Sequence, residues 1–143
     1  YDYQDNTFHS HPGYYIDYFE MRLAQLQVLH NLHYEIKKIR KMPKQALVIA
    51  DYIMYMADYV VEMNIPDQQI EKLEEISEQM KQEELPKTRE EFEGRALLYH
   101  ILMDLEEFLV YKKRFVSGLD EKKLRIYWKQ EMEQKDSANE LQK

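Results

Sequence analysis

Apolar residues recur at intervals of three and four along most of this chain, which is the period of helices that bury one face. The pattern predicts a first helix over residues 14–41 and a second over residues 44–63, with Pro43 between them. Tyr52, Tyr55 and Tyr59 add an aromatic row to the second helix. We expect the apolar row of the first helix to face the core: Ile16, Phe19, Leu23, Leu26, His30 and His33.

Two further long helices follow. Pro66 suits the first turn of a third helix, which has a narrow apolar seam at Ile70, Leu73, Ile76 and Met80. Thr88 followed by Glu91 forms a capping box, which predicts the start of a fourth helix that runs to about residue 116. A shorter helix is expected over residues 120–135.

These elements predict an all-α fold, because no alternating strand pattern occurs between them. Short connections between the helices favour an antiparallel up-and-down bundle of four long helices plus the shorter C-terminal helix. Residues 1–135 are expected to form a single helical domain, and the polar residues 136–143 are expected to be a disordered tail.

Composition narrows the function classes. The 143 residues carry a net charge of −7, which disfavours nucleic acid binding, because phosphate contacts need accumulated positive charge. No run of 18 apolar residues appears, so we expect the chain to be soluble. There is no cysteine, which excludes disulfides and thiolate metal sites. The chain begins at Tyr1 and not at methionine, and we expect it to be part of a longer protein.

Two histidine pairs are the candidate binding residues. His9 and His11, one residue apart, can both reach one metal ion; the alternative is that they only cap the entrance of the first helix. His30 and His33 lie one turn apart. If the first two helices form a hairpin, these imidazoles lie level with Tyr52 and Tyr55 and form a cleft for an aromatic acid, or else simply pack together.

Catalysis is not expected. Asp104 can face His100 one turn earlier, and a carboxylate can orient a histidine base. No nucleophile or phosphate loop accompanies this pair, so we predict no enzymatic activity and no cofactor.

Self-association is expected through the outer surface of the fourth or fifth helix. Leucine, isoleucine and phenylalanine residues between positions 97 and 109 span too wide an arc for one neighbouring helix. Tyr127 and Trp128 sit among charged residues. An exposed patch of this kind commonly marks an interaction surface, which favours a homodimer.

Several segments carry sequence motifs that are more distinctive than the overall composition. Residues 5–15 read Asp-Asn-Thr-Phe-His-Ser-His-Pro-Gly-Tyr-Tyr, residues 85–93 read Leu-Pro-Lys-Thr-Arg-Glu-Glu-Phe-Glu, residues 95–98 read Arg-Ala-Leu-Leu, and residues 104–109 read Asp-Leu-Glu-Glu-Phe-Leu. These segments resemble the C-terminal domain of the aromatic acid exporter family, bacterial membrane proteins related to the fusaric-acid-resistance transporters. The matching positions, which have no assigned role, are Asn6, Phe8, His9, His11, Tyr14, Tyr15, Arg22, Thr88, Glu91, Phe92, Arg95, Asp104, Glu107 and Phe108.

The resemblance implies a soluble cytosolic domain at the cytoplasmic face of the cell membrane. It would assemble or regulate the transmembrane portion of the same polypeptide, without catalysis, and a small aromatic acid is a further partner. Two alternatives stay open. One is a ligand- or metal-sensing domain that uses His9 and His11, or His30 and His33 with the tyrosines. The other is a simple dimerisation bundle.

Overall fold

The computed structural model describes residues 12–39, 43–119, 121–124 and 126–128. Within them lie four long helices: α2 (Pro12–Ile36), α3 (Ala46–Ala57), α4 (Asp67–Lys81) and α5 (Arg89–Ser117). Residues 121–124 and 126–128 are helical as well, and these described ranges contain no strand. The all-α prediction is confirmed. Residues 1–11 and the predicted tail at 136–143 lie outside the described residues.

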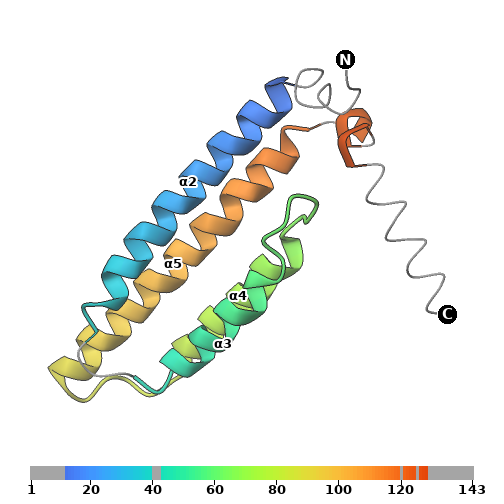
Figure 1. Ribbon diagram of the computed structural model, residues 1–143. Helices are drawn as coiled ribbons and strands as arrows, with labels where there is room; N and C mark the ends of the chain where they lie inside the picture. The colour runs from blue at the N-terminus through green and yellow to red at the C-terminus, as the bar shows by residue number, and fades with distance from the viewer. Residues whose placement is uncertain (1–11, 40–42, 120, 125, 129–143) are drawn as a thin grey trace.

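The helices alternate in direction, as the prediction of an up-and-down bundle requires (Figure 1). The two longest, α2 and α5, lie side by side and antiparallel. Tyr14 at the start of α2 packs on Phe115 at the end of α5, with ring centroids 5.5 Å apart. Glu35 at the other end of α2 meets His100. The helices α3 and α4 form a hairpin that packs against α5.

The inner helix of the bundle is α5, because α2 covers one side of it and the α3–α4 hairpin covers another. Its apolar side chains are therefore 1–4% exposed at Leu98, Ile101, Leu102, Leu105, Phe108 and Leu109. Trp128 is 3% exposed and is also part of the interior. The dimer surface expected on these residues is thus wrong: the wide apolar arc is filled by neighbouring helices of the same chain.

The apolar row predicted to bury α2 lies outside the core. The residues of α2 that are buried are Tyr14, Met21, Gln25, Val28 and Leu32. Ile16, Phe19, Leu23 and Leu26, which we call the outer row, are 51–65% exposed. At about 100° per residue the outer row lies roughly opposite the buried residues. The helix has two apolar faces and α5 covers only one, so the expectation that the outer row packs inside is wrong.

Both helices around Pro43 are shorter than predicted. The first ends at Ile36 and not near residue 41, and tight turns follow in which Lys38 N donates to Glu35 O and Ile39 N donates to Ile36 O. The second ends at Ala57 and not at residue 63. Tyr59 N and Val60 N donate to carbonyls three residues earlier, which is the tighter winding common at helix ends.

The capping box at the start of α5 is present. Thr88 Oγ1 accepts a hydrogen bond from Glu91 N at 3.1 Å, and Lys87 N donates to the Glu91 carboxylate at 2.9 Å. The Glu91 amide, which has no partner within the helix, and the Lys87 amide, one residue before the cap, are satisfied in this way.

We predict that Thr88→Ala lowers the free energy of unfolding by about 0.5–2 kcal/mol, because it removes the acceptor for the Glu91 amide. The chain has a single tryptophan, the buried Trp128, so its fluorescence during denaturant unfolding measures the change. The matched control is Ser117→Ala at the exposed opposite end of α5. Equal losses in the two variants would contradict the role of the cap.

Candidate functional site

A carboxylate and histidine cluster lies between α2 and α5. His100 and Asp104 are one turn apart on α5, and the antiparallel pairing of the helices brings Glu35 of α2 against them. His100 Nε2 is 2.5 Å from Glu35 Oε1, and one ligand atom from each of the three residues lies within 4.8 Å of the others. Glu35 and Asp104 are half-buried, whereas His100 is exposed.

The closeness of the two carboxyl groups in the cluster affects the protonation of Asp104. Burial, together with the neighbouring Glu35 carboxylate, raises the pKa of Asp104 from 3.8 to about 6, and His100 opposes this shift. Among the described residues, no N–H or O–H group donates to Glu35 Oε2 or Asp104 Oδ2. Protonation of Asp104 relieves the repulsion between the carboxyl groups, and a divalent cation would do the same with His100 as a nitrogen ligand.

A polar network joins the opposite end of the bundle. Tyr14 OH donates to Glu62 Oε1 at 2.8 Å and accepts from Trp128 Nε1 at 2.9 Å. Lys112 Nζ donates to the carbonyls of Val61 and Glu62, at 2.7 and 2.6 Å. Burial lowers the pKa of Lys112 to about 8. These bonds attach the connection between α3 and α4 to the start of α2 and the end of α5.

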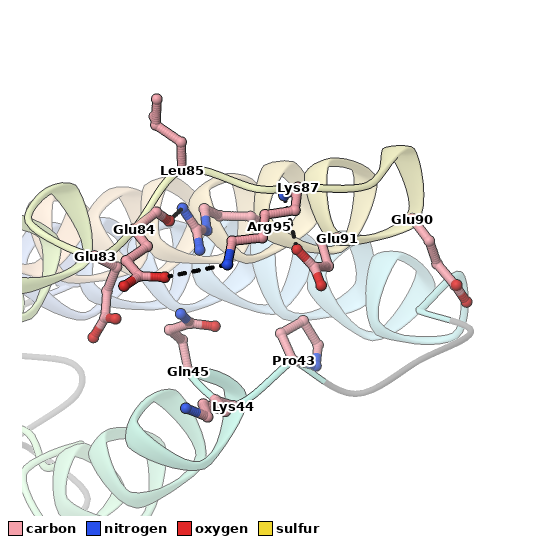
Figure 2. Close-up of a pocket in the computed structure, with 10 residues that line it drawn as sticks. All are labelled: Pro43, Lys44, Gln45, Glu83, Glu84, Leu85, Lys87, Glu90, Glu91 and Arg95. Carbon is pink, nitrogen blue, oxygen red and sulfur yellow. Dashed lines mark hydrogen bonds and ion pairs between the residues drawn. The ribbon is translucent and has the colours of Figure 1, made fainter.

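A cavity of about 550 Å³ opens at the end of the bundle where α3 and α5 begin (Figure 2). Two of its three cationic side chains have partners: Arg95 donates to the carbonyl of Glu84, and Lys87 Nζ lies 4.0 Å from the Glu84 carboxylate. None of the ten lining residues is aromatic, and acids outnumber bases among them. The cavity therefore lacks the ring-stacking surface that suits an aromatic carboxylate, although Lys44 lines it as a third cation.

The structure does not bring the histidines of α2 to the tyrosines of α3. No pair of Cα atoms from these two helices lies within 8 Å, so they do not form the expected hairpin. His30 and His33 are exposed. Tyr52 OH donates to Gln69 O at 2.6 Å, and Tyr55 OH accepts from Gln69 Nε2 at 3.3 Å. The tyrosines thus face α4, and the predicted cleft is not assembled.

The positions of the family resemblance serve several roles. His9 and His11, with Asn6 and Phe8, lie outside the described residues, so metal binding there stays a prediction. Arg22 donates to Tyr18 and Gln25, and Glu107 accepts from Tyr111. The other positions divide by burial: Tyr14 and Phe108 are buried, Tyr15, Arg95 and Asp104 are half-buried, and Thr88, Glu91 and Phe92 are exposed.

Sequence reasoning missed the residues whose partners come from distant segments. Glu35 joins the cluster only through the pairing of α2 with α5. Gln25 is buried, and its Nε2 donates to Phe108 O at 2.8 Å. A usable signal was present for Gln25 and Lys112, since a polar residue on an otherwise apolar helical face is a candidate for a buried hydrogen bond.

Comparison with known proteins identifies the family. Residues 1–113 match the model described as "Putative aromatic acid exporter C-terminal domain", and the chain belongs to this family. Over 98 residues, which are 68% of this chain, it is 32% identical to the uncharacterized protein YqjA of Bacillus subtilis (strain 168). The chain spans 30% of the length of that relative. No solved structure matches the chain. In the part of the chain that the structure describes, no helix is both long and apolar enough to cross a membrane.

Because the pKa of Asp104 is raised, we predict that the free energy of unfolding depends on pH. Between pH 3.8 and about 6 the folded chain holds a proton that the unfolded chain has lost, so stability falls as the pH rises through this window. Asp104→Asn removes the ionisation and supplies an amide donor to Glu35. We expect the variant to melt at a higher temperature than the parent at about pH 7.5, and the difference to shrink near pH 4.

Thermal unfolding followed by circular dichroism at the two pH values tests this expectation. The control is Glu106→Gln, two residues further along α5 and exposed, which also removes one negative charge. A gain in Asp104→Asn that is the same at both pH values would contradict the raised pKa of Asp104.

Proposed function

We propose that this chain is the cytosolic domain of a membrane exporter, and that it assembles or regulates the membrane-spanning portion of the same polypeptide by contact and without catalysis. The observation that carries the proposal is the outer row of α2. Four large apolar side chains along one helix face, each at least half exposed, form a surface of the kind that monomeric soluble proteins rarely leave uncovered.

Family membership supports this function. The description of the family names an exporter of which this domain is the C-terminal part. The chain spans 30% of the length of the relative YqjA, so the rest of that relative has length for other parts. Transport in this proposal belongs to those other parts. The bundle contributes a rigid body, because α5 is covered on both sides and its helix start is capped.

The test is deletion of residues 12–128 from the full-length protein in bacterial cells. We expect the truncated protein to reach the membrane but to lose most export, measured as increased accumulation of a labelled aromatic acid. A second measurement, chemical cross-linking in membranes, is expected to show fewer oligomers. Export and assembly equal to those of the intact protein would contradict the proposal.

The cytosolic placement has a separate test. Protease added to intact spheroplasts is expected to spare the domain, whereas protease added to inside-out vesicles is expected to release it. Cleavage in spheroplasts would place the domain on the other side of the membrane.

A second candidate function is the sensing of a divalent cation by the cluster of Glu35, His100 and Asp104. The observation that favours it is the meeting of three ligand atoms within 4.8 Å of one another. Titration calorimetry with Zn²⁺ tests it: binding that is lost in His100→Ala and kept in His33→Ala supports the cluster. Equal binding by both variants assigns the metal to other residues.

A further inference from the structure

The outer row of α2 has the spacing of a coiled-coil seam. Its residues follow one another at alternating intervals of three and four, which places them at positions a and d of a heptad. Such a 3.5-residue repeat keeps facing a partner when two helices coil around each other. His30 and His33, both exposed, continue the same positions toward the end of the helix.

The charges of α2 disfavour a lipid surface as the partner of this row. Helices that lie on anionic membranes carry Lys and Arg along their polar face. Within α2 the only such residue is Arg22, against the three acids Asp17, Glu20 and Glu35. The Arg22 guanidinium also donates to Tyr18 OH at 3.0 Å and to Gln25 Oε1 at 2.7 Å.

We infer that the outer row joins two copies of this chain as a parallel coiled coil. A two-fold axis along the seam makes the surface self-complementary, so that each residue of the row packs against its counterpart. At the flanking positions, Tyr15 of one copy lies opposite Glu20 of the other, and Arg22 lies opposite Gln27. No like charges oppose each other in this register.

The parallel direction rests on the proposed function. Two copies that follow membrane-spanning portions in one membrane point the same way, and their α2 helices therefore run in the same sense. An antiparallel pair would instead place position a of one copy opposite position d of the other.

Disulfide cross-linking distinguishes these arrangements, because the chain has no cysteine of its own. In the parallel pair, Leu26 at position d faces Leu26 of the second copy, so Leu26→Cys is expected to give a covalent dimer in oxidising buffer. The matched control is Leu47→Cys on α3, a leucine that is 71% exposed and outside the seam. If neither Leu26→Cys alone nor its mixture with Leu23→Cys cross-links more than this control, the inference is overturned. Cross-linking of a mixture of Leu23→Cys and Leu26→Cys, with none in either alone, would overturn the parallel direction.

Light scattering tests the association without a covalent bond. The parent is expected to show twice its chain mass of 17.6 kDa. The double variant Leu23→Glu and Leu26→Glu is expected to return to the single-chain mass with unchanged helicity by circular dichroism, because both side chains are exposed in the single chain. Leu47→Glu, the control, is expected to keep the doubled mass. A parent that stays at the single-chain mass at every concentration would refute the seam.

The two proposals fail separately. A single-chain mass for the parent, combined with loss of export on deletion of the domain, rejects the seam and keeps the regulatory function. A doubled mass for the parent, combined with unchanged export on deletion of the domain, keeps the seam and rejects the regulatory function.

Discussion

Burial of α5 on two sides is the constraint on which the rest of the structure depends. Its apolar side chains cover more than half of its circumference, and one neighbouring helix cannot remove such an arc from water. The hydrophobic effect therefore favours packing of α2 on one side of α5 and of the α3–α4 hairpin on another. Because α2 and α3 each reach the core through α5, they do not need to pair with each other.

Polar groups complete the bundle where apolar packing ends. Lys112 is buried, and it donates from α5 to the carbonyls of Val61 and Glu62 in the connection after α3, so its ammonium group has hydrogen-bond partners. Glu62 in the same connection accepts from Tyr14, and Trp128 donates to the same hydroxyl. The end of the bundle at which α2 begins is thus held by hydrogen bonds between four separate segments.

The features that could be predicted from the sequence are those with a local cause. The helices follow from the period of apolar residues, and the start of α5 follows from Thr88 and Glu91, which interact within one turn. The inner side of α2 could not be predicted in this way. Its two faces carry apolar residues at similar intervals, and the choice between them depends on α5, which is remote in the sequence. The same holds for Glu35, which meets His100 and Asp104 only through that pairing.

The hydrogen bond from Gln25 to the carbonyl of Phe108 has a mechanical consequence. It is buried near the middle of α2, and sliding the two helices past each other by one turn, about 5.4 Å, would strand the amide in an apolar interior. Sliding of α2 along α5 is therefore opposed, and the two helices are expected to move as one rigid unit. A push or a twist applied at the end where α2 begins is transmitted through both helices together to the far end, roughly 37 Å away for a helix of 25 residues.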